Sequence, residues 1–307
     1  MTGSFKRLWG YLAVLLSACF FALVSTLTKV AYSLGMTPLQ VLTLQSCTAF
    51  LILLAYSLVF SPRSLRIARD MLPRLAVQSI IGGLGTSTLF LYALKYLPAS
   101  FSTMLLFTYP VLVTLGAYVF LQQKVLRVQL IAVGIAAGGT MLSTQFWLLA
   151  SRSLNWTGIL FGLGSAIAYS FFILYGENIL QRIEPLTTLI YMQLFSALVL
   201  VLVQLPGYTL QGIPLTVNWV QFFIGVSLAT IASILPFWLL LEGIRRIGAS
   251  KAAVLGTFEL PVAFLFAYIF LGERFGVYQL AGAILITASV VILRITDLDS
   301  PEVKSHR

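Results

Sequence analysis

Apolar segments of about twenty residues follow one another along the whole chain, and they constrain its fold more than any other feature. The chain of 307 residues is 59% hydrophobic and 9% charged. A water-soluble domain of this size could not cover so much apolar surface. A helix of about twenty apolar residues spans the roughly 30 Å hydrocarbon core of a bilayer. Because backbone in lipid must satisfy its own hydrogen bonds, and short alternating strands are absent from the sequence, we predict an all-α integral membrane protein.

Ten such segments can be counted, and the connections between them leave no room for a soluble domain. We expect ten transmembrane helices at approximately residues 9–31, 39–60, 75–94, 98–121, 128–148, 157–178, 186–205, 218–241, 249–271 and 276–295. Lys6 and Arg7 before the first run resemble the start of a secretory signal, and Cys19 resembles a lipoprotein cleavage site. The run continues to Ala31, however, and similar runs follow, which favours a first membrane span.

Basic residues lie in the connections, and they fall unequally on the two sides of the membrane. With a cytoplasmic N-terminus, fourteen Lys and Arg residues lie in inside segments: Lys6, Arg7, Arg63, Arg66, Arg69, Arg74, Lys124, Arg127, Arg182, Arg245, Arg246, Arg294, Lys304 and Arg307. Four lie outside, namely Lys29, Lys95, Arg152 and Arg274, and Lys251 lies within its span. The positive-inside rule therefore predicts that both termini are cytoplasmic. Since the net charge of +10 is not gathered on one face, we expect no nucleic-acid partner.

One stretch of the sequence occurs twice. Ten of the 32 residues from 99 to 130 are identical to the residue 150 positions later, and several of the others exchange one apolar residue for another. Earlier spans align at an offset of 148, which matches Ser17 with Ser165 and Gln45 with Gln193. Five spans per half is an odd number, so the second half enters the membrane from the opposite side. We predict two inverted five-helix repeats, residues 1–150 and 151–307, the second with a short cytoplasmic tail.

The second copy resembles the EamA-type members of the drug/metabolite transporter superfamily. The residues that carry the resemblance are Ala249–Ala253, Glu259–Ala263, Leu271–Arg274 and Gln279–Ile286. The first copy departs from the family pattern at Leu121-Gln122-Gln123, where Leu-Gly-Glu is usual, and Gln45 and Gln193 stand where an Arg is common. The resemblance implies alternating-access transport of small metabolites through a cavity between the halves, and amino-acid exporters form one branch of the superfamily.

Glu259 is the leading candidate for a functional residue. It lies near the middle of the ninth predicted span, where a carboxylate costs about 2.5–3.5 kcal/mol to insert and should face the bundle interior or a water-filled cavity. Pro261 removes a backbone N–H and loosens the helix near residue 257, and Pro110 stands at the corresponding place in the fourth span. Glu259 could bind a substrate ammonium group or take up a proton, since burial disfavours the charged form. The alternative is a protonated carboxyl that hydrogen-bonds a neighbouring helix.

Further candidates lie at similar depth. Tyr109 is the repeat partner of Glu259, and Gln45 and Gln193 are buried amides at equivalent positions; each could line the substrate cavity or bond across helices for packing. Trp238 and Tyr92 could stack on a ligand, although lipid-facing or interfacial placement is the more common position for such rings. Lys29 and Glu177 occupy equivalent positions at opposite faces of the membrane, as snorkelling terminal charges or gate contacts.

Other kinds of site find little support in the sequence. The only histidine is His306, in the tail, so no metal set of His and Cys is formed, and no nucleophile–base constellation of an enzyme is visible. We expect no metal and no cofactor. The Gly82-Gly83-x-Gly85 run lacks the Lys-Ser/Thr ending of a phosphate loop. The Gly134/Gly138 and Gly158/Gly162 pairs predict close helix packing within one bundle, with a dimer interface as the alternative.

These observations predict a multi-pass secondary transporter of the cytoplasmic membrane, a monomer or weak homodimer, whose partners are a small-molecule substrate, lipid and possible coupling protons. Amino-acid export is the leading function, and export of cationic drugs or other metabolites is the alternative. A membrane receptor or lipid scramblase is the alternative outside transport. The predicted site comprises Glu259, Tyr109, Gln45, Gln193, Trp238 and Tyr92, with helix breaks at Pro110 and Pro261.

Overall fold

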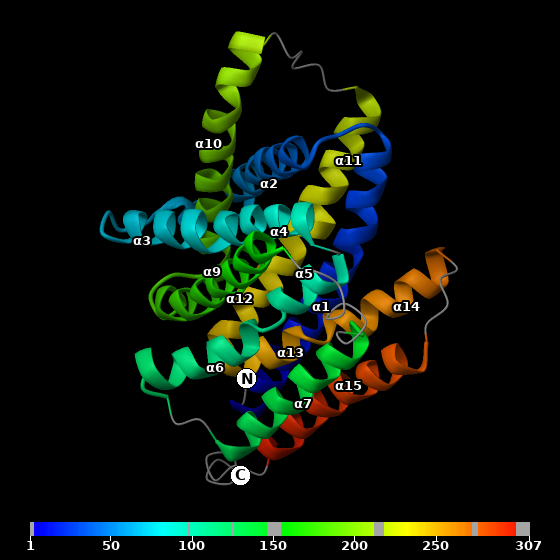
Figure 1. The fold of residues 1–307 in the computed structure, drawn as a ribbon. Coiled ribbons are helices and arrows are strands. Elements are labelled where there is room, and N and C mark those ends of the chain that lie inside the picture. Colours follow the sequence, from blue (N-terminus) through cyan, green and yellow to red (C-terminus); the bar gives the residue numbers. More distant parts are fainter. Residues whose placement is uncertain are drawn as a thin grey trace.

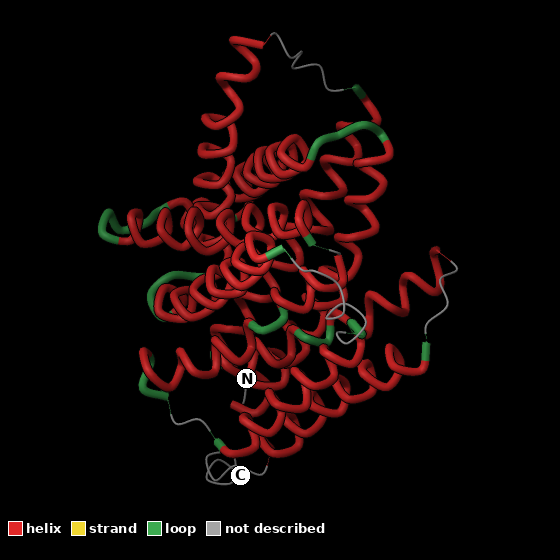
Figure 2. The backbone as a smooth tube through the Cα atoms, viewed as in Figure 1, coloured by secondary structure: helices red, strands yellow, loops and turns green. Residues whose placement is uncertain are grey.

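The regular structure of the chain is entirely helical wherever it is described. The computed structural model describes residues 3–97, 99–123, 126–145, 155–211, 218–271 and 276–298, and no strand occurs in these ranges (Figure 2). Some residues used above lie outside the described residues: Lys124, Arg152, Glu273, Arg274, Lys304, His306, Arg307 and the side chains of Lys29 and Arg294. Within the described ranges, the prediction of an all-α membrane protein is confirmed.

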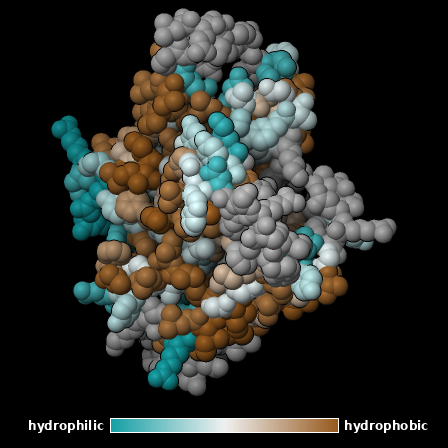
Figure 3. Space-filling view, in the orientation of Figure 1, coloured by the Kyte–Doolittle hydropathy of each residue, from teal (hydrophilic) through white to brown (hydrophobic). Residues whose placement is uncertain are grey.

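Eight helices in the described part of the chain are long and apolar enough to cross a membrane. They are Phe5–Val24, Pro38–Phe60, Met71–Ala93, Ser102–Phe120, Trp156–Leu180, Pro185–Leu205, Trp219–Ile247 and Ala249–Phe266. Two shorter apolar helices, Arg127–Ser143 and Val277–Leu293, stand where the fifth and tenth spans are expected. Hydrophobic side chains make up much of the face shown in Figure 3, and hydrophilic ones project from its left edge. This surface suits a lipid environment around the helices.

The helices divide into two successive series. The first comprises α1 (Gly3–Ser33), α2 (Pro38–Phe60), the short 3-10 helix η1 (Pro62–Leu65), α3 (Met71–Val77), η2 (Gln78–Leu84), α4 (Gly85–Tyr96), α5 (Ala99–Leu106), α6 (Tyr109–Phe120) and α7 (Arg127–Ser143). The second comprises α9 (Trp156–Leu180), α10 (Pro185–Gln211), α11 (Trp219–Ala229), η3 (Thr230–Ile234), α12 (Leu235–Ile247), α13 (Ala249–Gly256), α14 (Glu259–Leu271) and α15 (Val277–Leu298).

Helix ends follow local sequence signals. Thr37 and Asn218 form capping boxes with Gln40 and Gln221 at the starts of α2 and α11. The eighth predicted span ends at Ile247 instead of residue 241. Glu242 and Arg246 form an ion pair one turn apart that extends the helix, and Gly248, with a φ of 85°, then ends it.

Two helices contain a π-helical turn at corresponding places. η2 interrupts the run from α3 to α4, and η3 interrupts the run from α11 to α12. In the second case Pro236 lacks the N–H that would bond the carbonyl of Ala232. The side-chain amide of Gln45 donates to that carbonyl oxygen at 3.5 Å. Such turns break the regular hydrogen-bond ladder and are frequent at functional sites.

The two series interleave instead of forming separate bodies. α7 runs alongside α15 (Figure 1), α1 packs against α12, α4 against α9 and α2 against α10, and each of these pairs joins one helix from each series. Fully buried side chains of the main core also come from both, including Tyr11, Val113, Phe172, Ile244 and Ile286. The main core is thus shared by the two series, and the described helices pack as a single bundle.

α7 and α15 approach each other closely. A Cβ added to Gly282 would lie 2.4 Å from the carbonyl oxygen of Gly139, and one added to Gly139 would lie 2.9 Å from that of Gly282. The prediction that Gly134 and Gly138 pack closely is wrong, because no described atom lies within 4 Å of a Cβ added to either. It holds for Gly158 and Gly162, whose added Cβ atoms would meet Leu97 at 2.6 Å and Leu105 at 2.5 Å.

Replacing Gly282 or Gly139 by Ala should destabilise the protein, because the new methyl group forces two backbones apart at a cost of about 1–3 kcal/mol. Gly134→Ala is the matched control on α7, the helix of Gly139, because the methyl group has room there. Thermal unfolding in detergent measures the difference. Equal melting temperatures for Gly282→Ala and Gly134→Ala would contradict the close crossing of α7 and α15.

Candidate functional site

Two helices are broken at positions 150 residues apart, and each resumes at a polar residue. α5 ends at Leu106 and α6 begins at Tyr109, while α13 ends at Gly256 and α14 begins at Glu259. Threonine hydroxyls at the two breaks satisfy backbone carbonyls: Thr108 donates to Leu105 O at 2.7 Å, and Thr257 donates to Val254 O at 2.6 Å. The breaks are therefore stable away from water, with Pro110 and Pro261 just beyond them.

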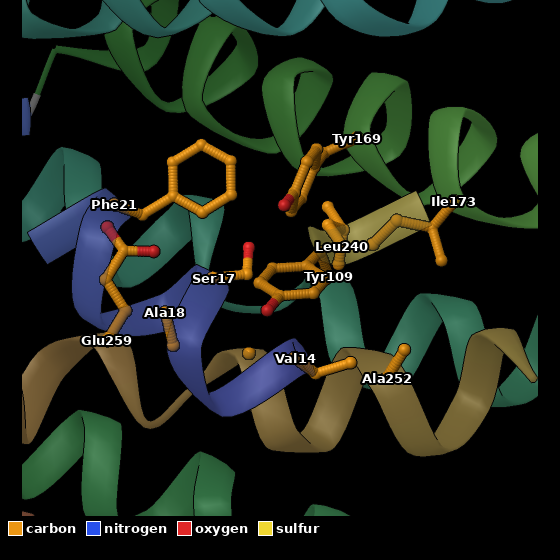
Figure 4. Close-up of a pocket in the computed structure, with 11 residues that line it drawn as sticks. Val14, Ser17, Ala18, Phe21, Tyr109, Tyr169, Ile173, Leu240, Ala252 and Glu259 are labelled. Atoms are coloured by element: carbon orange, nitrogen blue, oxygen red, sulfur yellow. The ribbon is translucent and has the colours of Figure 1, made fainter. Parts of the chain in front are cut away.

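A small cavity lies beside these breaks (Figure 4). Its lining comes from α1, α6, α9, α12, α13 and α14, and consists of Val14, Ser17, Ala18, Phe21, Tyr109, Tyr169, Ile173, Leu240, Ala252, Gly256 and Glu259. The space open to the centre of a water molecule is about 10 Å³, which is room for one water. In this conformation the cavity is too small for a metabolite.

Glu259 is the only charged residue in the cavity lining. Within the described part of the chain, its carboxylate has no hydrogen bond or ion pair with another side chain. It stands in the first turn of α14, where the helix dipole favours a negative charge. A half-buried carboxylate without a basic partner can compensate its charge with a proton or with a cationic ligand.

Aromatic rings form a continuous series through the cavity wall. Phe21 of α1 meets Phe237 of α12 with ring centroids 5.1 Å apart, and Phe237 meets Phe172 of α9 at 5.8 Å. Phe172 stacks on Tyr169 at 6.0 Å, and Tyr169 meets Tyr109 of α6 edge-on at 4.7 Å. Three of these rings line the cavity. Aromatic faces and edges of this kind attract organic cations and apolar groups alike.

The structure brings Tyr109 and Glu259 to one cavity, and it adds Tyr169, which our sequence reasoning missed. The hydroxyl of Tyr109 donates to Ala253 O at 3.1 Å, which fixes α6 against α13. A signal for Tyr169 was present in the repeat. The 148-residue offset that matches Ser17 with Ser165 also matches Phe21 with Tyr169.

Gln45 and Gln193 do not line this cavity. Gln45 donates to Ala232 O, and Gln193 donates to the hydroxyl of Ser233, so that both amides bind the π-helical turn η3. Both amides thus donate hydrogen bonds to groups of the irregular turn in the eighth span.

Tyr92 and Trp238 also lie away from the cavity. Tyr92 is 49% exposed and its ring packs at 5.4 Å from that of Phe161. Trp238 is exposed on α12, while the neighbouring Phe237 provides the inward ring. Their outward positions suit contact with lipid.

A larger groove lies between α6 and α9. Its volume is about 760 Å³, and Leu112, Leu115, Val119, Phe120, Ile167, Phe171 and Leu174 provide most of its lining. No charged residue lines it. Because several of these side chains are exposed on membrane-spanning helices, lipid chains can fill the groove.

In the described part of the chain, no three His, Cys, Asp or Glu side chains are grouped so that they could hold a metal ion. Cys19 and Cys47 are free thiols on α1 and α2. The polar chemistry of the cavity thus comes from one carboxylate and from hydroxyl groups.

A helical bundle with broken helices around an enclosed acidic cavity is typical of membrane transporters. The model of the EamA-like transporter family matches the chain twice, over residues 8–145 and 156–295. The chain belongs to the EamA-like transporter family, and through it to the drug/metabolite transporter superfamily. It is a multi-pass protein of the cytoplasmic membrane.

Similar proteins carry transporter names. The chain is 24% identical to the uncharacterized inner membrane transporter YicL of Salmonella typhimurium, over 80% of this chain and 81% of that protein. It is 24% identical to the uncharacterized transporter sll1319 of Synechocystis, over 66% of this chain and 60% of that protein. It is 26% identical to the uncharacterized transporter YcbK of Bacillus subtilis, over 62% and 61% of the two chains.

The fold is also found in a crystal structure of another protein. The two structures superpose with a TM-score of 0.75 at 17% sequence identity, over 97% of this chain and 99% of the other. At this identity the likeness concerns the fold alone.

Gly256→Ala should impair transport. A Cβ at this position would lie 2.5 Å from the Tyr109 hydroxyl oxygen and would occupy the wall of the cavity. Gly164→Ala on α9 is the matched control, because its methyl group would meet Leu89 at an ordinary 3.5 Å. Substrate flux in proteoliposomes, compared at equal protein insertion, measures the effect. Equal flux in the two variants would contradict a role of the cavity in substrate transport.

Proposed function

We propose that the chain is a secondary active transporter that exports small amphiphilic metabolites, with amino acids as the leading substrate class. The observation that carries this proposal is the position of Glu259, the only charge lining a cavity enclosed by helices of both series. The substrate ammonium group binds the Glu259 carboxylate, and the rings of Tyr109, Tyr169 and Phe21 enclose its apolar part.

The proposed architecture is ten spans in two inverted repeats, 1–150 and 151–307, with both termini in the cytoplasm. Two separate family matches support the repeat. So do the equivalent helix breaks before Tyr109 and Glu259 and the equivalent π-helical turns η2 and η3. α7 and α15, shorter than the other spans, complete the two sets of five. In inverted-repeat transporters the site lies near the midplane between the halves, and the proposal places the two breaks there.

Transport requires alternating access, because the cavity holds only one water when closed. Rocking of one repeat against the other would open it to each side in turn. The same carboxylate can couple substrate transport to a proton gradient. When the site is empty Glu259 carries a proton, and a cationic group displaces that proton on binding, so substrate and proton would move in opposite directions.

A second candidate substrate class is organic cations such as cationic drugs. The observation that favours it is the absence of any basic side chain from the cavity lining, which leaves a substrate carboxylate without a charged partner. A polar groove open to lipid would have favoured a scramblase. The groove between α6 and α9 is apolar, so it does not support that alternative.

Glu259→Gln should reduce flux at least tenfold, because it removes the only charge in the lining, and a lost buried charge contact costs about 2–5 kcal/mol. The assay compares uptake of a radiolabelled amino-acid mixture and of tetraethylammonium into proteoliposomes, with and without an imposed pH gradient. Uptake of one probe but not the other decides between the two substrate classes. A pH gradient should accelerate transport by the wild type and leave Glu259→Gln unaffected.

The matched control is Glu184→Gln, which neutralises an exposed carboxylate before α10. It should transport like the wild type. If the Glu259→Gln variant shows wild-type flux and a wild-type response to pH, the proposed role of the carboxylate is wrong.

The orientation of both halves can be tested by labelling single cysteines in a chain that carries Cys19→Ala and Cys47→Ala. A membrane-impermeant maleimide should label Leu34→Cys and Asn155→Cys on intact cells. It should label Arg63→Cys and Gln181→Cys only after permeabilisation. All four positions are solvent-accessible residues outside the helix interiors or at helix ends. If Leu34 and Asn155 label from opposite sides, the proposed inversion is wrong.

A further inference from the structure

Glu177 connects three parts of the chain that are far apart in sequence. It lies near the end of α9, which stops at Leu180. Its Oε1 accepts a hydrogen bond from Gln123 Nε2 at 2.6 Å, and its Oε2 accepts one from the backbone N–H of Ala249 at 2.7 Å. Gln123 follows α6 in the first series, whereas Ala249 begins α13 in the second. One carboxylate thus joins the end of α9 to two chain corners.

The contact with Ala249 also caps a helix. The residue before α13 is Gly248, which has no side chain to accept from the free N–H groups of the first turn. Its φ of 85° brings the chain sharply from α12 into α13, with the Cβ position facing the Glu177 carboxylate at 3.6 Å. Glu177 replaces the missing cap from another helix, and its charge is favourable at that helix terminus.

The three connected elements lie at one end of the bundle. The corner at Gly248 lies two residues after Arg246, which itself follows Arg245, and the end of α9 is followed by Arg182. By the distribution of basic residues, this is the cytoplasmic end. A movement that separates the end of α9 from the corner between α12 and α13 must break the bond between Glu177 and Ala249.

The same two helices also line the central cavity. α9 carries Tyr169 eight residues before Glu177, about 12 Å along the helix axis, and α13 carries Ala252 and Gly256. A relative movement of α9 and α13 therefore changes the cavity and the Glu177 contacts together.

We propose that Glu177 is the cytoplasmic gate residue of this transporter, and that its hydrogen bonds to Gln123 and Ala249 hold the cavity closed on that side. The inference rests on the proposed transport function. Glu177 acts as a positioning residue: it does not touch the substrate, but releasing its two contacts opens the path from the cytoplasm. Loss of a hydrogen bond to a charged group shifts a two-state equilibrium by about tenfold or more.

The test measures conformation without any substrate, so it can fail independently of the substrate assignment. Spin labels at Arg182→Cys and Arg245→Cys, both exposed and outside the cavity lining, report the distance between the end of α9 and the end of α12. Pulsed electron paramagnetic resonance is recorded on the full chain in lipid nanodiscs, in the background with Cys19→Ala and Cys47→Ala. Glu177→Ala should raise the ratio of long-distance to short-distance populations about tenfold.

Two further variants make the result decisive. Glu184→Ala removes an exposed carboxylate that has no contact with Gln123 or Ala249, and it should give the wild-type distribution. Gln123→Ala removes one of the two contacts but leaves the helix cap, and it should give a smaller shift in the same direction. A wild-type distribution in a folded Glu177→Ala variant overturns the proposal. If that variant does not fold, a wild-type distribution in Gln123→Ala overturns it.

Discussion

Within a bilayer, a peptide group without a hydrogen-bond partner destabilises the fold by several kcal/mol, and the irregular parts of this protein are arranged around that constraint. Thr108 and Thr257 satisfy carbonyls at the two helix breaks, and Gln45 satisfies the carbonyl that Pro236 leaves free. Each donor is internal to the bundle. This is why broken helices persist at the centre of the protein, and why polar residues at the breaks can face a cavity instead of lipid.

Much of the fold could be predicted because the lengths of the apolar runs, and the positions of polar residues within them, can be read from the sequence. Apolar runs of sufficient length become helices in lipid, and the described helices follow the predicted segments closely. The repeat offset of 150 residues proved informative at residue level, since α6 begins at Tyr109 and α14 begins at Glu259. Proline and the duplicated pattern thus located the irregular positions before any contact was known.

The remaining part of the site depends on rotation about each helix axis, which the sequence does not specify. In a membrane helix both the lipid-facing and the core-facing residues are apolar, so hydrophobic patterning does not distinguish the faces. Tyr92 and Trp238 accordingly lie outside the cavity, while Tyr169 lines it. The amides of Gln45 and Gln193 bind a π-helical turn just before Pro236, which we had not predicted. The partners of Glu177 come from distant chain corners, and helix prediction does not place such corners in space.

The series of rings from Phe21 through Phe237, Phe172 and Tyr169 to Tyr109 crosses four helices, two from each series. Contacts between aromatic rings are weakly directional compared with hydrogen bonds, and an edge-on pair can become an offset stack at small cost. In the proposed rocking movement, the rings at the centre of the interface can therefore rearrange at small cost, while the directional bonds of Glu177 lie at its end. Under the proposed mechanism, the two hydrogen bonds of Glu177 stabilise the closed state, and the aromatic contacts at the centre add little to the barrier once those bonds are broken.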